Sequence, residues 1–260
     1  MRNMIDNFMH YRYFLKENVM KGVKLKYRNS YLGIVWSFID PLLTTMVLTF
    51  VFGTLFGRDM DYSFPAYILT GRLLYTFYSG ATSACVRSIR TNAGMIKKVY
   101  VPKYMYPLSS ILSNYITFLI SLLVLVGAII VLRITPSFYM LFSFVPLLLL
   151  LLLAFGTGMI LAALGVFFRD LEYLWKVFMM LIMYTCAIFY DISKFEALGK
   201  AWVLHINPLF CIIKNFRNCI IYARPLELST CLYAFGFGVV LTTVGLILFN
   251  KNQDKFILHV

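Results

Sequence analysis

The chain is 260 residues long, and 61% of these residues are hydrophobic while only 13% are charged. A soluble domain of this length cannot bury so much apolar surface around one core, so the composition excludes a soluble globular protein. The formal net charge is +13, but the basic residues are spread among long apolar runs and form no continuous basic stripe. We therefore expect a membrane as the main environment and no nucleic-acid partner.

Six apolar runs predict six transmembrane helices. A helix satisfies its own backbone hydrogen bonds in hydrocarbon, and about 20 apolar residues cross a bilayer. The expected spans are residues 32–56, 64–86, 107–132, 138–168, 173–190 and 231–249. The fourth is long and contains Pro146, which predicts a tilt, a kink or an extension, and the fifth is short with Lys176 at one end. The prediction is an all-α polytopic membrane protein with residues 1–260 in a single transmembrane domain.

The basic residues predict the orientation of these spans. With six spans, sixteen Lys and Arg residues fall on the side of the two termini and seven on the other side, while Arg72 lies inside a span. Because the side richer in Lys and Arg stays in the cytoplasm, both termini are expected there.

Two cytoplasmic segments have helical patterns of their own. Residues 1–30 are expected to form a basic interfacial helix on the inner leaflet, because apolar residues recur on one side of the 5–28 segment. That side consists of Ile5, Phe8, Met9, Leu15, Val19, Met20 and Val23. Between the second and third spans, Asn92 is expected to cap a short helix that stops before Pro102. That helix carries Met95, Ile96, Lys97, Lys98 and Val99.

The outer connection, residues 191–230, is too apolar for a simple solvated loop. Asn207 and Pro208 are typical of the cap and first position of a helix. From Cys211 to Tyr222, apolar pairs alternate with Lys214 and Arg217 at helical spacing. We expect a re-entrant or interfacial helix that forms an outer gate between spans five and six.

The sequence carries no recognisable catalytic or metal site. His10, His205 and His259 lie in three separate segments, and the five cysteines are odd in number without CxxC spacing. The phosphate-binding pattern GxxxxGK[ST] does not occur in the 260 residues. We therefore expect a transport subunit and not an enzyme, with no cofactor bound by this chain and any ATP handled by a partner.

Only Asp40 and Arg72 are ionisable residues well inside an expected span, where such residues often mark function. Asp40 precedes Pro41, which frees a carbonyl group. The pair is either a functional break or an acid near the interface that pairs with a neighbouring helix or with the basic amino-terminal segment. Arg72 is either a snorkelling or paired charge near the outer face or a ligand for a substrate.

The entry to the first span resembles that of the membrane subunits of ABC-2 type polysaccharide exporters. It reads Leu25-Lys-Tyr-Arg-Asn-Ser-Tyr-Leu-Gly-Ile-Val-Trp-Ser-Phe-Ile-Asp-Pro-Leu42. Further similar segments follow in the same order at residues 92–102, 167–170, 207–209 and 216–217, so the resemblance covers nearly the whole chain. Members of that family export O-antigen, capsule, teichoic acid or similar lipid-linked glycans.

This resemblance implies a permease in the bacterial cytoplasmic (inner) membrane that pairs with a second copy of itself and with two ATPase subunits, which bind ATP and magnesium. It implies an ATPase-coupling interface at Asn92, Met95, Ile96, Lys97, Lys98 and Val99, with Lys24 and Arg28 contributing from the amino-terminal helix. The candidates for the channel or gate are Trp36, Asp40, Arg72, Tyr75, Phe189, Tyr190, Phe216 and Arg217.

Three other functions are open to the same sequence. An ABC-2 permease for lipids or drugs shares the architecture and differs only in its substrate. An integral membrane glycolipid transferase predicts activity in the purified chain alone, which the scattered histidines and carboxylates do not favour. A scaffold that only anchors an ATPase predicts no stimulation of ATP hydrolysis by a substrate.

Overall fold

The computed structural model describes residues 11–28, 30–56, 63–190 and 202–256, and within these ranges the chain is helical without a β-strand. The all-α prediction is therefore confirmed for this part. Residues 1–10 of the expected interfacial helix and residues 191–201 of the expected outer loop lie outside it. The helices are α2 (Arg12–Tyr27), η1 (Gly33–Val35), α3 (Trp36–Phe56), α4 (Phe64–Thr91), α5 (Ala93–Ile96), α6 (Met105–Val131), η2 (Phe138–Ser143), α7 (Phe144–Phe167), α8 (Leu171–Thr185), α10 (Trp202–His205), α11 (Pro208–Ile220), α12 (Leu228–Asn252) and η3 (Gln253–Lys255).

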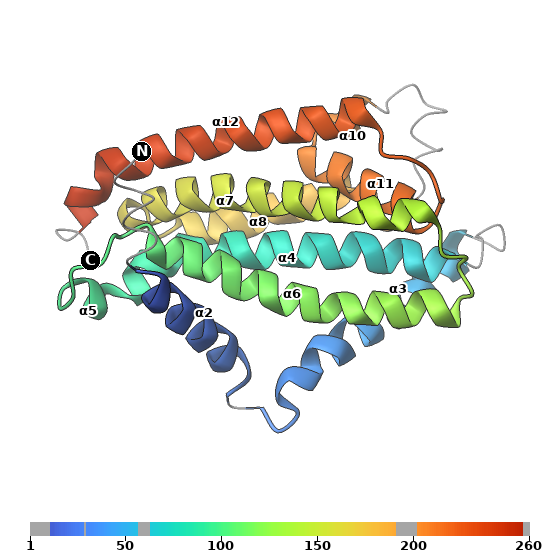
Figure 1. Cartoon of the computed structure of the whole chain (residues 1–260), viewed down its shortest axis with the longest axis horizontal. Helices are drawn as coiled ribbons and strands as arrows, with labels where there is room; N and C mark the ends of the chain where they lie inside the picture. Colours follow the sequence, from blue (N-terminus) through green and yellow to red (C-terminus); the bar gives the residue numbers. More distant parts are fainter. Residues whose placement is uncertain (1–10, 29, 57–62, 191–201, 257–260) are drawn as a thin grey trace.

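The long helices run roughly parallel, and α4 lies in the middle of the bundle (Figure 1). Most of the side chains of α4 are buried, because α3, α6, α7, α8 and α11 all pack against it. The end of α12 and the short α5 lie at one end of the bundle, while α10 and α11 lie at the other.

Close packing of α7 against α12 depends on small residues. A Cβ atom added to Gly156 would lie 2.6 Å from the backbone nitrogen of Thr242, and one added to Gly245 would lie 2.8 Å from the carbonyl oxygen of Gly156. Backbones that approach so closely leave no room for side chains at these positions. The small residues of the fourth span thus serve packing within the subunit.

Four segments are long and apolar enough to cross a membrane, namely Gly33–Thr54, Met105–Val131, Phe138–Phe167 and Leu228–Lys255. These match the first, third, fourth and sixth expected spans. At 1.5 Å per residue, the 28-residue α4 is about 42 Å long, which exceeds a hydrocarbon thickness of about 30 Å. Helix α4 is less apolar than those four segments because most of its side chains face protein. The 15-residue α8 is only about 22 Å long, so the six-span count stays a prediction.

The expected fourth span begins as a 3₁₀ helix over Phe138–Ser143 and continues as α7. Pro146 lies in the first turn of α7, where a backbone N–H has no partner within the helix. The extra length is therefore an extension at the start of the span, and the proline does not interrupt its interior.

Helices α2 and α3 form a V whose apex stands away from the bundle (Figure 1). The apolar face of α2 is not free: Leu15, Val19 and Val23 are buried, and the first two pack with Val101 and Met105. Met20, which we expected on that face, is exposed. The basic helix is therefore anchored to α6 as well as available to a lipid surface.

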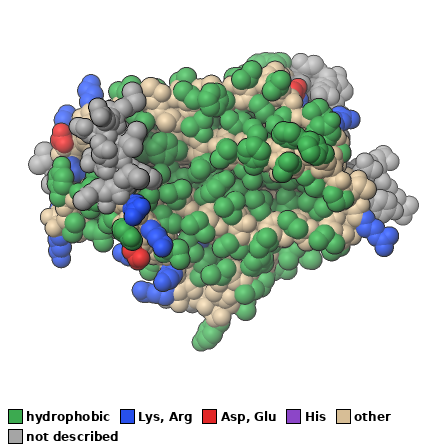
Figure 2. Space-filling view, viewed as in Figure 1, with side chains coloured by type: hydrophobic (Ala, Val, Ile, Leu, Met, Phe, Trp, Pro, Cys, Tyr) green, Lys and Arg blue, Asp and Glu red, His purple; other side chains and the backbone are tan. Residues whose placement is uncertain are grey.

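Apolar side chains cover the middle of the visible face of the molecule, while Lys and Arg side chains gather mostly at the end that carries α5 (Figure 2). A broad apolar surface with charges at an end fits an integral membrane protein.

Candidate functional site

A polar cavity of about 370 Å³ lies between the apex of the V and the helices α4 and α6. Its walls come from the end of α2, the start of α3 and the facing sides of α4 and α6. The lining includes Lys26, Tyr27, Trp36, Ser37, Asp40, Thr44, Arg72, Thr76, Asn114, Thr117 and Ser121. Polar cavities are expensive in a membrane domain, so this one is the leading candidate for a functional site.

Three of the predicted channel residues, Trp36, Asp40 and Arg72, meet in this cavity. Trp36 and Asp40 are exposed, and Arg72 is half-buried. The Nη1 atom of Arg72 lies 3.9 Å from the sulfur of Met183. Among the residues that the structure describes, neither Asp40 nor Arg72 forms an ion pair within 4.0 Å. The carboxylate of Asp40 and the guanidinium of Arg72 therefore both line the cavity and do not pair with each other.

Lys26 adds a second cation to the cavity. Partial burial lowers the pKa of its ammonium group, and the negative charge of Asp40 opposes that shift. The neighbouring Tyr27 shares a short hydrogen bond with Ser37, which holds the end of α2 against the start of α3. The fold thus places the positive charge of Lys26 near Asp40 without a direct salt bridge.

The helix does not break at Pro41, and of the two alternatives for Asp40 and Pro41 this continuity favours an acid near the interface. Helix α3 continues from Trp36 to Phe56 with Pro41 inside it. Because Pro41 has no N–H, the carbonyl of Ser37 loses its usual partner four residues on. The hydroxyl of Ser121 on α6 donates to this carbonyl at 3.1 Å. The proline therefore creates a polar contact between α3 and α6 in the wall of the cavity.

A second cavity of about 680 Å³ adjoins the first along α2, α4 and α6. Lys26, Asn114 and Thr117 line both cavities, so we treat them as one and call it the α2–α6 groove. The second part is lined by Arg87 and by Ser88, Thr91, Asn92, Ser110 and Ser113. The groove therefore runs from Asn92, at the end of α4, to Arg72 deep in the bundle.

Arg87 belongs to a cluster of charges around one carboxylate. Glu172 at the start of α8 lies 3.4 Å from Arg87, 4.0 Å from Arg90 and 3.9 Å from Lys176. These contacts join the end of α4 to α8 beside the opening of the groove. Three cations share a single carboxylate here, so the cluster keeps a net positive charge.

The segment between α4 and α6 protrudes at the same end of the molecule. Asn92 precedes α5 as expected, but its amide donates to the carbonyl of Ser88 at 2.7 Å and does not cap α5. Met95 and Ile96 are partly buried against the core, while Lys97, Lys98 and Val99 are exposed. Helix α5 ends at Ile96, so the two lysines lie in the turn after it and not on the helix, where we expected them.

The structure places Lys24 and Arg28, which we expected beside that protrusion, away from it. The hydroxyl of Tyr11, at the start of α2, donates to the carbonyl of Tyr100 at 3.3 Å. Lys24 lies about 20 Å further along the helix. The start of α2 thus lies beside the protrusion, whereas Lys24 and Arg28 lie near the apex of the V.

At the end of the bundle opposite α5, α11 begins as predicted, because Pro208 is its first residue and the Asn207 side chain accepts a hydrogen bond from the backbone of Leu209 at 3.0 Å. Phe216 and Arg217 are both 1% exposed. Arg217 donates to the carbonyls of Tyr67 at 2.9 Å and Ala187 at 3.0 Å. These gate candidates therefore lie inside the bundle, between α4 and the segment after α8.

The remaining channel candidates are packed. Tyr75 is buried and donates to the carbonyl of Met179 at 2.9 Å. Phe189 is buried and stacks on Phe52 with ring centroids 5.0 Å apart, and Tyr190 donates to the carbonyl of Tyr184 at 2.6 Å. The structure does not bring them into the α2–α6 groove.

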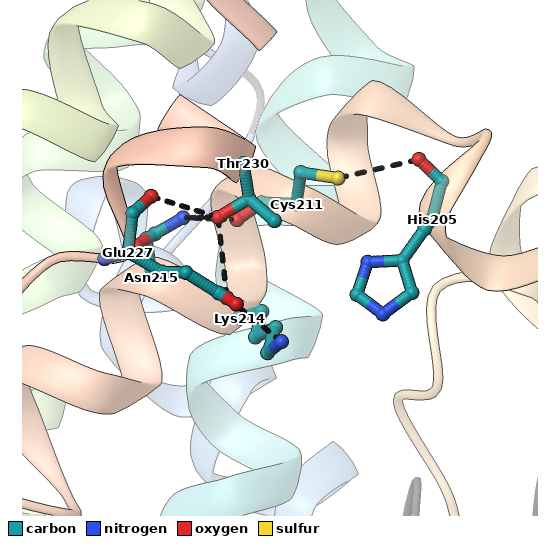
Figure 3. A network of polar contacts seen from close by, with 6 residues as sticks. All are labelled: His205, Cys211, Lys214, Asn215, Glu227 and Thr230. Atoms are coloured by element: carbon teal, nitrogen blue, oxygen red, sulfur yellow. Dashed lines mark hydrogen bonds and ion pairs between the residues drawn. The ribbon is translucent and has the colours of Figure 1, made fainter. Parts of the chain in front are cut away.

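A polar network joins α11 to the start of α12 (Figure 3). Lys214 forms a 2.7 Å ion pair with Glu227, and the amide of Asn215 donates to Thr230 at 2.7 Å. The backbone N–H of Glu227 donates to the side-chain amide oxygen (Oδ1) of Asn215 at 2.8 Å. The hydrogen bond from Lys214 holds the pKa of Glu227 below its usual value. This network fixes the turn that carries the chain from α11 into α12.

Several groove residues were missed by sequence reasoning. Ser110, Asn114, Thr117 and Ser121 recur on α6 at spacings of four, three and four residues, which places them on one helix face. That polar stripe within an apolar span was a readable signal. Lys26 carried no such signal, because it is one of many basic residues in its segment.

No cluster of three or more His, Cys, Asp or Glu side chains suited to a metal occurs in the described ranges. What the arrangement offers is a charged, hydroxyl-rich groove in a helical membrane domain, with an exposed basic protrusion at its opening. This combination defines a membrane transport protein more readily than an enzyme. The chain belongs to the ABC-2 type transporter family, whose sequence model matches residues 13–221.

Individual relatives extend over almost the whole chain. It is 30% identical to the O-antigen export system permease protein RfbA of Klebsiella pneumoniae over 239 residues, covering 91% of this chain and 90% of that protein. It is 24% identical to the protein of the same name from Myxococcus xanthus, covering 98% of each chain. Identity to the polysialic acid transport protein KpsM of Escherichia coli is 20%, covering 92% of this chain and 93% of that one.

Proposed function

We propose that this chain is the membrane-spanning permease subunit of an ATP-driven exporter that moves a lipid-linked polysaccharide across the bacterial cytoplasmic membrane. The observation that carries the proposal is the match over nine-tenths of the chain to a relative named as an O-antigen export permease. The hydroxyl-rich α2–α6 groove supports it, because a glycan needs many hydrogen-bonding partners inside an otherwise apolar domain. Export of lipids or drugs is less favoured by these relatives.

In this proposal the chain performs no bond chemistry. Two copies form the membrane part, and two separate ATPase subunits bind ATP and magnesium. The ATPase contact is the segment from Asn92 to Val99, where Lys97 and Lys98 are exposed. Both termini and this segment face the cytoplasm, and the chain crosses the membrane six times with α4 and α8 among the spans. Lys24 and Arg28 extend the contact along α2.

The outer segment around α11 acts as a gate in the same proposal. The contacts of Arg217 with α4 and with Ala187 connect α11 to two neighbouring segments. Movement of α4 and α8 during the ATP cycle would reach the outer face through these contacts. Phe216, Phe189 and Tyr190 pack in the same region and would move with it.

The test is co-purification and export. An affinity-tagged chain is expressed with a candidate ATPase subunit from the same genome, solubilised in mild detergent and isolated, and surface polysaccharide is measured in a strain that lacks the permease. We expect a stable complex containing the ATPase and restored surface polysaccharide. A chain that reaches the membrane, binds no ATPase and restores no polysaccharide would contradict the proposal. Glycolipid transferase activity of the purified chain alone would support the enzyme alternative.

A further inference from the structure

We propose that the α2–α6 groove binds the phosphate-bearing head group of a membrane amphiphile, with Lys26 and Arg72 as its phosphate ligands. That this amphiphile is the lipid-linked glycan rests on the proposed function. The existence of a phosphate site rests on the groove alone.

The charges of the groove favour an anion. Its lining contains three cations, Lys26, Arg72 and Arg87, and one carboxylate, Asp40. Arg87 is already paired with Glu172, so Lys26 and Arg72 are the cations left to act on a ligand. An arginine half-buried in a membrane domain is costly unless a charge or many dipoles compensate it, and a phosphate supplies that compensation.

The uncharged lining suits the hydroxyl groups of a sugar next to that phosphate. The hydroxyls of Ser110 and Thr117 donate to backbone carbonyls of their own helix at 3.1 and 3.0 Å. The amide of Asn114 donates to the carbonyl of Ser110 at 2.8 Å. The hydroxyl donors of Ser110 and Thr117 and one amide N–H of Asn114 are used in these bonds, so the side-chain oxygen atoms remain as acceptors for the donating hydroxyls of a sugar.

The V formed by α2 and α3 gives such a head group a way in from the side. In its middle part, α2 is held tightly to α6: Asn18 donates to Ser109 at 2.7 Å, and a Cβ atom on Gly22 would lie 2.9 Å from the hydroxyl of Ser113. Toward the apex the two helices diverge (Figure 1), and Lys26 lies where the space opens. A lipid head group at the level of this opening meets Lys26 first and Arg72 deeper in the groove.

The test uses the full-length chain in phosphatidylcholine nanodiscs. The sequence has three tryptophans, so replacing Trp175 and Trp202 by Phe leaves Trp36, in the groove wall, as a single fluorescent reporter. Farnesyl diphosphate is the probe and farnesol is its phosphate-free match. We expect saturable binding of the diphosphate, with a Kd at least tenfold higher for Lys26→Gln and for Arg72→Gln. Lys21→Gln removes the same charge from an exposed site on α2 outside the groove and should leave the Kd within twofold.

Each outcome decides one point. Equal binding of farnesol, or equal losses in Lys21→Gln and Lys26→Gln, would overturn the phosphate site. If phosphatidylglycerol in the nanodisc displaces the diphosphate at similar concentrations, the ligand is bulk anionic lipid and the glycolipid assignment is overturned. The binding measurement contains no ATPase, so its result is independent of the export assay. A chain that restores polysaccharide export but does not bind farnesyl diphosphate refutes only this inference. A chain that binds farnesyl diphosphate but does not restore export refutes only the proposed function. Thermal unfolding of each variant shows that a lost signal is not lost folding.

Discussion

The guanidinium carbon of Arg217 lies 3.4 Å from the centre of the Tyr67 ring, and its Nη2 atom donates to the carbonyl oxygen of the same tyrosine. Its Nη1 atom donates to Ala187, which adopts a left-handed backbone conformation with φ of 47°. The hydroxyl of Tyr67 donates to that same carbonyl at 2.9 Å. One arginine therefore joins α11, α4 and the segment after α8.

Replacing Arg217 by Met is expected to destabilise the protein by about 3 kcal/mol, because the buried carbonyls of Tyr67 and Ala187 each lose a charged donor, although a hydroxyl still donates to each. Arg217→Lys keeps the charge but cannot reach two carbonyls at once, so it should fall between the wild type and Arg217→Met. Thermal unfolding in detergent measures the order. Equal stability of all three proteins would show that Arg217 contributes little to the connection.

Gly71 lies under the same guanidinium. A Cβ atom at this position would be 2.5 Å from the Nη2 atom of Arg217, which its hydrogen bonds hold in place. We expect Gly71→Ala to lower stability by about 1–3 kcal/mol, the usual cost of overpacking. Gly53→Ala is the matched control, since no atom lies within 4 Å of its added Cβ, and helix propensity alone should stabilise it by up to about 1 kcal/mol.

A double-mutant cycle separates this explanation from general damage to α4. If Gly71→Ala acts by displacing the guanidinium, its cost should fall strongly in the Arg217→Met background. A cost that is the same in both backgrounds would mean that the added methyl group disturbs something other than Arg217.

Hydropathy predicted most of the helices because lipid-facing residues must be apolar, and four of the six runs reappear as long apolar helices. The second expected span ends at residue 86, five residues before the end of α4. The last part of α4 carries Arg87 and Arg90, which contact Glu172 instead of lipid. The fifth was drawn too long, because the chain leaves α8 after Thr185. Both differences arise from tertiary contacts that local hydropathy does not contain.

The site was predictable in its parts but not in its assembly. Asp40 and Arg72 stood out as charges within apolar runs, and each was predicted singly. Their shared cavity depends on the V of α2 and α3, which no local pattern specifies. Arg217 was expected on a re-entrant or interfacial helix of the outer connection, and the structure buries its side chain among carbonyl groups of α4 and of the segment after α8.

The contact between Ser121 and Ser37 gives a prediction that depends on Pro41. Ser121→Ala should cost about 1–2 kcal/mol, because the Ser37 carbonyl, which has no partner within its helix, then loses the hydroxyl. In a Pro41→Ala background the new N–H can bond to Ser37, so the same change should cost much less. Ser110→Ala is the control, since its hydroxyl bonds only within α6. Chemical or thermal unfolding of the four variants would contradict the idea if the two costs were equal.

Charge reversal on the protrusion between α4 and α6 tests the proposed coupling interface. Lys97→Glu with Lys98→Glu is expected to reduce export at least tenfold while the permease remains folded in the membrane, because both side chains are exposed and neither supports the core. Surface polysaccharide and ATP hydrolysis are measured together. Lys251→Glu with Lys255→Glu makes the same charge change at another exposed site and should leave export intact. Normal export by a correctly assembled Lys97 and Lys98 double variant would remove these lysines from the coupling mechanism.

The ion pair of Lys214 and Glu227, between α11 and the start of α12, predicts a pH dependence of stability. The pKa of Glu227 is lower in the folded protein than in the unfolded chain, where it is about 4.3. The pair therefore adds stability above pH 4.3 and loses it as the pH falls through the lower, folded value. The side chains are 22% and 40% exposed, so the contribution should be below about 1 kcal/mol. Glu227→Gln should lower the melting temperature slightly at pH 7, and this difference should shrink as the pH falls below about 4.3. A difference that stays unchanged as the pH falls would show that the effect does not come from the charge of Glu227.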